Sequence, residues 1–97
     1  MFDITYAELT GGKTFDCGID NPDIIIGLDS RGDWRYLYYS ANISNSSTPT
    51  AESRQFRMQG SGSDAAATTI SGSVVTITNF FTTNSPSYRM FIAKKNS

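Results

Sequence analysis

The chain has 97 residues, which is enough for one domain and too few for two. Only 18% of them are charged and the formal net charge is −1, so the overall balance does not favour binding to nucleic acid. Histidine is absent and Cys17 is the single cysteine, which excludes Ser-His-Asp catalysis, Cys-His catalysis and Cys/His zinc sites within one chain. We therefore expect a protein that is not an enzyme and that uses no cofactor or metal.

The start of the chain lacks the basic leader and the apolar core of a signal peptide. The longest aliphatic run is Ile24–Ile26, far shorter than the roughly 18 residues of a membrane span. A single cysteine cannot form an internal disulfide, so nothing requires an oxidising compartment. We expect a protein that is made in the cytoplasm and does not enter a membrane.

Strand patterns dominate the first half of the chain. From Phe2 to Leu9 apolar and polar residues alternate, with Phe2, Ile4 and Tyr6 on one side, which is typical of a half-buried strand. The apolar segment Ile24–Leu28 predicts a short strand that is buried on both faces. Further strands are predicted over Lys13–Ile19, where Phe15 and Cys17 share a face, and over Trp34–Ile43, with turns at Gly11–Gly12, Asp20–Asp23 and Asp29–Asp33.

The second half alternates strands with polar loops. We expect the loops Ser44–Ser53 and Gly60–Asp64 to be the most mobile segments, because neither carries enough apolar area to offset its ordering entropy. Ser71–Ser73 predicts a tight hairpin. Strands are predicted over Arg54–Gln59, Thr68–Ile70, Val74–Thr82 and Tyr88–Ala93, followed by a solvated tail over Lys94–Ser97.

These segments amount to seven or eight short strands with no dominant helix. Each sheet that they form must bury one apolar face, so two packed layers or a closed barrel are the stable arrangements. The sequence therefore predicts an all-β fold, namely a single-domain antiparallel β-sandwich of jelly-roll type that spans residues 1–97.

Several short motifs have simple structural explanations. Arg31–Asp33 matches the integrin-binding tripeptide, but Gly between charged residues is ordinary turn composition. Asn42 and Asn45 begin glycosylation sequons, and chance alone supplies as many in a chain so rich in Ser and Thr. The Asp residues of the first third lack calcium-loop spacing, and Glu8 and Glu52 show no glycosidase-like arrangement. We interpret all of them as turn and surface residues.

The most aromatic segment begins at Trp34. Trp34, Tyr36 and Tyr38 should share one face of a strand, and Tyr39 should point the opposite way. Such side chains suit three roles: the sandwich core, an oligomer interface, or a platform for a sugar ring. Phe81 is the second ring of a Phe-Phe pair whose members point to opposite faces, so one ring should reach a neighbour. The candidate interface or ligand residues are therefore Trp34, Tyr36, Tyr38, Tyr39 and Phe81.

The Ser/Thr/Asn/Gly-rich strands, the Gly-Ser turns and the absence of His resemble small virion proteins of tailed bacteriophages. The segment Ser71–Lys95, about a quarter of the chain, is most similar to the strand-turn-strand endings of tail-fibre tips and head decoration proteins. The resemblance implies a structural component of the virion that assembles as a homo-oligomer, with a trimer favoured. Its partners would be other virion proteins, and its exposed loops could bind cell-surface carbohydrate.

The number of apolar side chains also favours assembly. A sandwich of this size can enclose only part of the aromatic and aliphatic residues of the chain, so the remainder should be buried between subunits. The alternative function is a monomeric carbohydrate-binding module or lectin-like domain, because a similar sequence texture occurs in such modules. A monomer in solution would favour this alternative.

Overall fold

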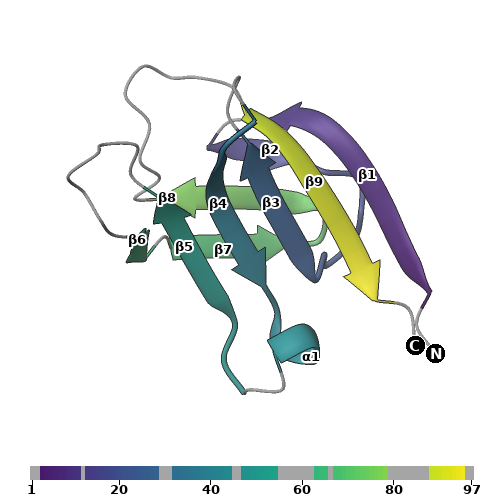
Figure 1. Ribbon diagram of the computed structural model, residues 1–97. Coiled ribbons are helices and arrows are strands. Elements are labelled where there is room, and N and C mark those ends of the chain that lie inside the picture. The colour runs from purple at the N-terminus through teal and green to yellow at the C-terminus, as the bar shows by residue number, and fades with distance from the viewer. Residues whose placement is uncertain are drawn as a thin grey trace.

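Nearly all of the regular structure consists of strands, as the alternating pattern predicts. The computed structural model describes residues 3–11, 13–28, 32–44, 47–54, 63–65, 67–78 and 88–95. These ranges contain one short helix, α1 (Ala41–Ser44), and the strands β1 (Ile4–Gly11), β2 (Thr14–Asp16), β3 (Ile24–Leu28), β4 (Trp34–Tyr39), β5 (Thr50–Arg54), β6 (Ser63–Ala65), β7 (Ala67–Ser71), β8 (Val74–Thr78) and β9 (Tyr88–Lys95) (Figure 1). The all-β class is confirmed.

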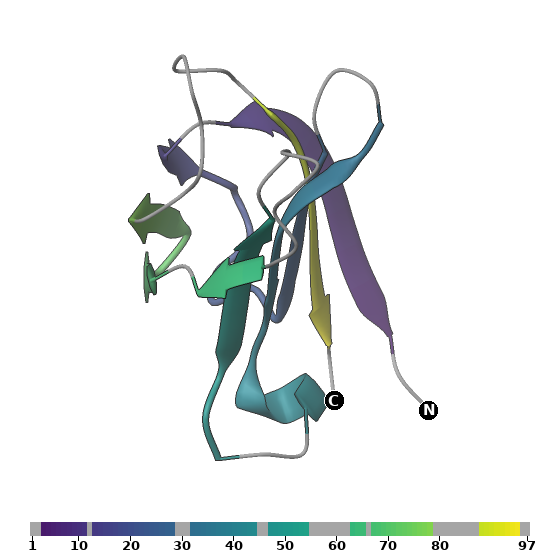
Figure 2. The same ribbon diagram turned by 60° about the vertical axis from the view of Figure 1, so that its left-hand side comes forward.

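The strands form two antiparallel sheets. The large sheet has six strands in the order β1-β9-β3-β4-β5-β6, and the small sheet has three in the order β2-β8-β7. The two sheets lie as separate layers, and the strands of the small sheet run across those of the large sheet (Figure 1, Figure 2). The expected β-sandwich is therefore confirmed.

The connections between the sheets have a jelly-roll character. β1 pairs with β9 in the large sheet and β2 pairs with β8 in the small sheet, so the β1–β2 segment and the β8–β9 segment pair across both layers. The order β9-β3-β4-β5 has the Greek-key form, in which a fourth strand returns beside the first of three consecutive ones. The described sheets have six and three strands rather than four each, because β3, β4 and β5 follow one another within the large sheet.

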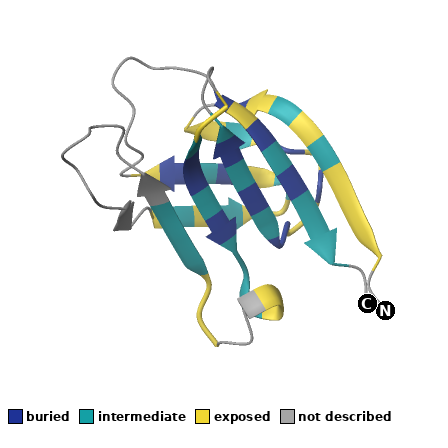
Figure 3. Ribbon diagram, viewed as in Figure 1, coloured by how far each residue is buried: buried dark blue, intermediate teal, exposed yellow. Residues whose placement is uncertain are grey.

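The core lies between the two sheets. Alternate residues of β3, β4, β8 and β9 point into it, and these buried positions lie where the layers overlap (Figure 3). Phe15 and Cys17 both pack here, which confirms that they share a face. The side chains at its fully buried centre are Ile25, Tyr36, Val75, Ile77, Met90 and Ile92.

The predicted tight hairpin connects β7 to β8. Ser71 pairs with Val74, which leaves Gly72 and Ser73 as a two-residue loop. Gly72 has a φ of 60°, the conformation that a type II′ turn requires at its first loop position and that glycine adopts without strain. The prediction of a tight hairpin is confirmed, with Ser71 belonging to β7 rather than to the turn.

β1 directs Ile4 and Tyr6 away from the core and Ala7 and Leu9 toward it. The register on β9 places Ala7 opposite Ile92 and Leu9 opposite Met90, and opposite residues in a ladder share a face. Ala7 and Leu9 therefore pack against the core, whereas Ile4 is 59% exposed and Tyr6 is 55% exposed. Pairing with β9, rather than the local alternation, decides which side of β1 is buried.

A strand occupies part of the segment predicted as a polar loop. β5 pairs with β4, and Ala51, which lies opposite Tyr38, packs against the core. The prediction of a loop over Ser44–Ser53 is therefore wrong over Thr50–Ser53. Pairing with β4 satisfies the backbone of this segment, and one small apolar side chain is enough to fill its share of the core. Most of the strand predicted over Arg54–Gln59 lies outside the described residues.

The aromatic segment ends earlier than predicted. β4 stops at Tyr39 and α1 follows, so the prediction of a continuous strand to Ile43 is wrong. Ser40 precedes α1, and its Oγ accepts a hydrogen bond from the backbone N–H of Asn42 at 3.2 Å. A short polar side chain in this position caps a helix start, which is why the strand ends here.

The large sheet continues to Lys95, so the prediction of a solvated tail from Lys94 onward is wrong for both lysines. Lys95 lies opposite Ile4 of β1, and its backbone N–H donates a hydrogen bond to Asp23 Oδ2 at 2.8 Å. Lys94 Nζ donates to the backbone carbonyl of Asp20 at 2.5 Å. These contacts hold the end of β9 in the sheet.

Candidate interaction surface

The aromatic strand β4 divides its side chains between the core and the outer face, which is the face of the large sheet directed away from the small sheet. Tyr36 is fully buried and Tyr38 is 8% exposed. The core interpretation therefore holds for both, and their candidacy as interface or platform residues is wrong, because they are enclosed between the sheets. Tyr39 pairs with Ile24 and Thr50 and lies on the outer face.

A bulge separates Trp34 from the other aromatic residues of β4. Gly27 pairs with Tyr36 and Leu28 pairs with Trp34, so Arg35 is an extra residue in this strand. Trp34 shares the outer face with Leu28, and the prediction that it shares a face with Tyr36 is wrong. The bulge breaks the alternation on which that prediction depended. The remaining candidate, Phe81, lies outside the described residues.

Apolar side chains cross the outer face in rows. Successive register partners in one row are Tyr6, Ala93, Ile24 and Tyr39, and those in the next row are Phe91, Ile26 and Leu37. Glu8 and Glu52 lie at the two ends of the second row. An antiparallel sheet that packs one face on the core normally carries polar residues on the other. Here both faces of the large sheet are apolar.

Much of this outer face is accessible. Ile4 and Tyr6 are more than half exposed, and Ile24, Ile26 and Phe91 are half-buried, as are the other apolar members of the rows. Single exposed apolar residues are common, whereas contiguous apolar patches on a surface are often sites of interaction.

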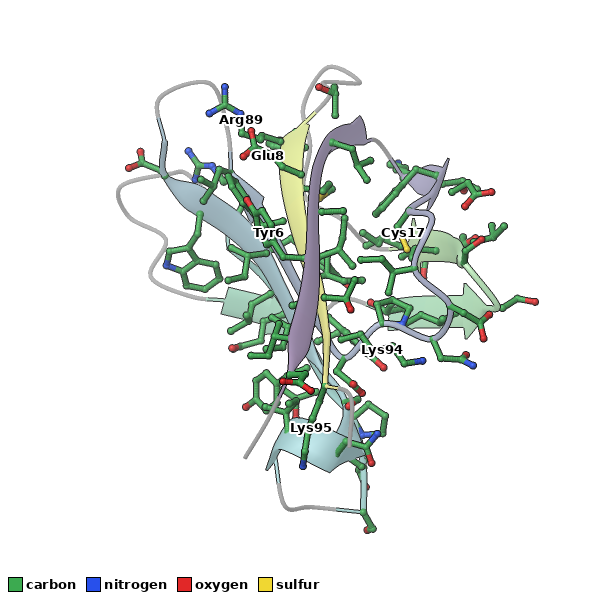
Figure 4. All side chains as sticks on the ribbon, turned by 90° about the vertical axis from the view of Figure 1, so that its right-hand side faces the viewer. Tyr6, Glu8, Cys17, Arg89, Lys94 and Lys95 are labelled. Carbon is green, nitrogen blue, oxygen red and sulfur yellow. The ribbon has the colours of Figure 1, made fainter. Side chains whose placement is uncertain are left out.

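A small polar cluster borders the outer face where β1 meets β9. The Tyr6 hydroxyl donates a hydrogen bond to Glu8 Oε2 at 3.2 Å, and Arg89 Nε lies 3.5 Å from Glu8 Oε1. The Tyr6 ring also packs against Phe91, with ring centroids 5.9 Å apart. Figure 4 shows Tyr6, Glu8 and Arg89 together on one side of the sheet and Cys17 on the other. Loss of hydration, followed by the hydrogen bond and charge of Glu8, raises the pKa of Tyr6.

Asp23 connects β3, β4 and β9 at one end of the molecule. Its Oδ1 accepts hydrogen bonds from Ser40 Oγ at 2.6 Å and Asn42 Nδ2 at 3.2 Å, and its Oδ2 accepts one from the Lys95 backbone. Burial alone would raise the pKa of Asp23, but these hydrogen bonds and the charge of Lys94 hold it below its ordinary value. The carboxylate is thus engaged in holding the fold.

A polar cleft of about 400 Å³ opens beside Asp23. The residues that line it are Asn21, Pro22, Asp23, Tyr38, Ser40, Asn42, Pro49, Thr68 and Ile70. Asn21 and Thr68 place an amide group and a hydroxyl group in the lining, where the amide donates to Asp20 and the hydroxyl is hydrogen-bonded to Tyr36. The ring of Tyr38 is too deeply buried to stack on a sugar, so this described lining supplies polar contacts without an aromatic platform.

A second pocket, of about 320 Å³, lies between α1 and the ends of β1, β3 and β9. It is lined by Ile4, Ile24, Asn42, Ile43, Ala93, Lys94 and Lys95. Ile43 of α1 is 37% exposed, and Lys95 Nζ donates to the Asn42 carbonyl at 3.3 Å. The pocket extends the apolar outer face as far as α1 and places a lysine at its rim.

The described part of the chain contains no group of three His, Cys, Asp or Glu side chains placed to hold a metal ion. Cys17 is buried, and its Sγ donates to the Ile19 carbonyl at 3.3 Å. Within the same ranges, no helix has the length and apolar character needed to cross a membrane.

The short motifs of the sequence add little to the site. Asn42 of the first sequon is engaged by Asp23, and Asn45 of the second lies outside the described residues, as does Arg31 of the integrin-type tripeptide. The outer face is therefore the feature best able to act on another molecule. No family model, curated protein or solved structure matches the chain.

Proposed function

We propose that this protein is a non-enzymatic structural component of a virion, of the phage capsid-decoration or tail-fibre type, that assembles as a homo-oligomer. The observation that carries the proposal is the outer face, where a sheet already packed on a core has a second apolar surface. A protein that works by assembly needs such a surface, whereas a catalyst needs reactive groups.

The dimensions of the outer face favour other copies of the chain as the molecules that cover it. Four strands about 4.8 Å apart (β1, β9, β3 and β4) and three rows of side chains about 7 Å apart, of which Leu28 and Trp34 form the third, span a projected area of roughly 400 Å². At about 25 cal/mol per Å², covering one such face contributes roughly 10 kcal/mol, which is within the range of the cost of association, about 4–15 kcal/mol. When two copies cover each other, both faces are buried and the gross contribution doubles, while side-chain ordering and polar desolvation offset part of it.

The virion assignment within this proposal is supported by the resemblance of the Ser/Thr/Asn/Gly-rich strands to phage virion proteins, which also favours a trimer. Other virion proteins are then further partners. The arrangement of genes beside the gene for this chain tests this part. Capsid or tail genes in the neighbourhood support it, and a neighbourhood of sugar-metabolism genes argues against it.

The assembly itself is tested by light scattering after size-exclusion chromatography. The wild type should have a multiple of the 10.6 kDa chain mass at micromolar concentration. Ile26→Thr with Leu37→Thr makes two neighbouring outer-face positions polar and should lower the mass in solution with unchanged circular dichroism. Val74→Thr is the matched control, because Val74 is an exposed apolar residue of the small sheet, and should leave the mass unchanged. A monomeric wild type would overturn the proposal.

A carbohydrate-binding module is the second candidate function, and the polar cleft beside Asp23 favours it. Amide and hydroxyl groups such as those of Asn21 and Thr68 suit sugar hydroxyls. Binding to a glycan array that is lost on Asn21→Ala, in a protein of monomeric mass, would support this function. Absence of glycan binding by the wild type would remove it.

A further inference from the structure

β1 is an open edge of the large sheet. Among the described strands only β9 pairs with it, and the ladder runs without a shift from Ile4–Lys95 to Gly11–Tyr88. Natural edge strands are usually kept short or are protected by charged side chains, Pro or a bulge. β1 has eight residues, no Pro, no Lys and no bulge, and its one charged side chain, Glu8, is engaged by Tyr6 and Arg89. An edge of this kind is suited to pairing with another strand.

The hydrogen bonds between β9 and β3 determine which backbone groups of β1 face the open edge. The Asp23 N–H donates to the Ala93 carbonyl, and the Lys95 N–H donates to Asp23 Oδ2, so Ala93 and Lys95 direct their backbone groups toward β3. In an antiparallel ladder the direction alternates from residue to residue. Ile92 and Lys94 therefore direct theirs toward β1.

The same alternation then applies within β1. Thr5 and Ala7 are the register partners of Lys94 and Ile92, so their backbone groups face β9. The intervening residues Ile4, Tyr6, Glu8 and Thr10 direct N–H and C=O toward the open edge. The side chains of these four residues are exposed and lie on the outer face, so the open edge and the outer face meet along one strand.

We propose that two copies of this chain join through antiparallel pairing of β1 with β1, about a two-fold axis at Ala7. In this register Tyr6 lies opposite Glu8 of the second copy and Ile4 lies opposite Thr10 of the second copy. Both are hydrogen-bonded pairs, because all four residues face the edge. The contact joins the two large sheets into one sheet with a continuous outer face.

Side-chain complementarity selects this register. Within one chain the Tyr6 hydroxyl already donates to Glu8, and the pairing about Ala7 brings a second Glu8 carboxylate beside each tyrosine. An axis at Glu8 would place two carboxylates opposite each other, which is destabilising. An axis at Tyr6 would leave Thr10 without a partner in the second β1. The Ala7 register uses the whole strand from Ile4 to Thr10.

This contact rests on the proposed function, because it is one of the contacts through which the copies would assemble. It adds an edge-to-edge contact to the covering of the outer face. A two-fold contact gives a dimer, or a larger assembly with an even number of copies when the outer faces also associate. A closed trimer would not contain it. The mass in solution therefore distinguishes the two-fold contact from the trimer that the resemblance favours.

Disulfide trapping tests the register. In a Cys17→Ser background, Ala7→Cys places two cysteines on the axis with Cα atoms about 4.5 Å apart, within the range that a disulfide spans. Mild oxidation should then give a covalent dimer in high yield. Thr5→Cys is the matched control, because the Ala7 register separates the two Thr5 positions by roughly 14 Å along the strands. It should stay reduced.

Proline substitution tests the backbone contact independently. Glu8→Pro removes an edge-facing N–H while leaving the β1–β9 ladder intact, and should lower the mass in solution while circular dichroism stays native. Glu8→Ala loses the same carboxylate but keeps the N–H, and should remain associated. An associated wild type in which Glu8→Pro has no effect, or in which Thr5→Cys cross-links and Ala7→Cys does not, would overturn this contact alone. A monomeric wild type would overturn the assembly as well.

Discussion

The hydroxyl group of Tyr36 on β4 forms a hydrogen bond with Thr68 Oγ1 on β7, and this contact joins the two sheets through polar side chains. Tyr36 is fully buried, and burial raises the pKa of its hydroxyl well above the ordinary value, despite the hydrogen bond to Thr68. The Tyr36 hydroxyl therefore stays protonated at neutral pH and at moderately alkaline pH.

We expect Tyr36→Phe and Thr68→Val each to lower the free energy of unfolding by about 1 kcal/mol, because each leaves a polar group in the interior without this partner. The double variant should lose less than the sum, since it removes both polar groups together. Urea titration of the four proteins measures this coupling. Additive losses would contradict the role of the hydrogen bond.

Asp23→Ala should lower the free energy of unfolding by about 2 kcal/mol at pH 7, because the donors at Ser40, Asn42 and Lys95 lose their acceptor. The pKa of Asp23 is lower in the folded than in the unfolded protein, so its stabilisation is complete above the ordinary pKa and is lost as the pH falls through the folded value. The difference between wild type and variant should therefore shrink below about pH 4. A constant difference between pH 7 and pH 2 would contradict this account.

Two glycines face the side chain of Met90 and should differ in their tolerance of alanine. A Cβ at Gly11 would lie 3.0 Å from Met90 Cγ and 3.1 Å from the Phe15 ring, whereas a Cβ at Gly27 would lie 3.0 Å from the mobile Met90 Sδ. We expect Gly11→Ala to cost about 2 kcal/mol and Gly27→Ala about 1 kcal/mol. Thermal unfolding of both variants measures the order, and the reverse order would contradict the packing described.

The thiol of Cys17 should report on opening of the sandwich. It is 4% exposed and donates to the Ile19 carbonyl, so a thiol reagent should label it slowly in native buffer. The labelling rate should rise with urea in parallel with the loss of structure. Fast labelling without denaturant would show that β2 separates easily from the core.

Local patterns predicted the features that depend on neighbouring residues. The hairpin at Gly72 follows from turn chemistry, and the shared face of Phe15 and Cys17 follows from alternation. The continuous apolar run Ile24–Leu28 also contained a signal of the outer face. A strand that is apolar on both sides exposes a second apolar surface unless something covers it. In β3 this second surface is formed by Ile24 and Ile26.

Features that depend on distant partners could not be predicted in this way. The bulge at Arg35 exists only in the register of β4 on β3, and it moves Trp34 out of the predicted row. Tyr6 was not a candidate site residue, because its exposure is decided by the pairing of β1 with β9 at the far end of the chain. Polar β5 is a strand for the same reason, since its partner β4 supplies the stabilisation.

The position of β9 has a consequence for how the protein folds. It lies between β1 and β3, although every other described strand precedes it in the chain. β1 and β3 have no strand between them until β9 pairs with both, and contacts between residues so distant in sequence slow folding. Until β9 has been synthesised, the apolar strand β3 has an unpaired edge, and such an edge favours aggregation. We therefore expect the yield of soluble protein to depend on how quickly β9 inserts between β1 and β3.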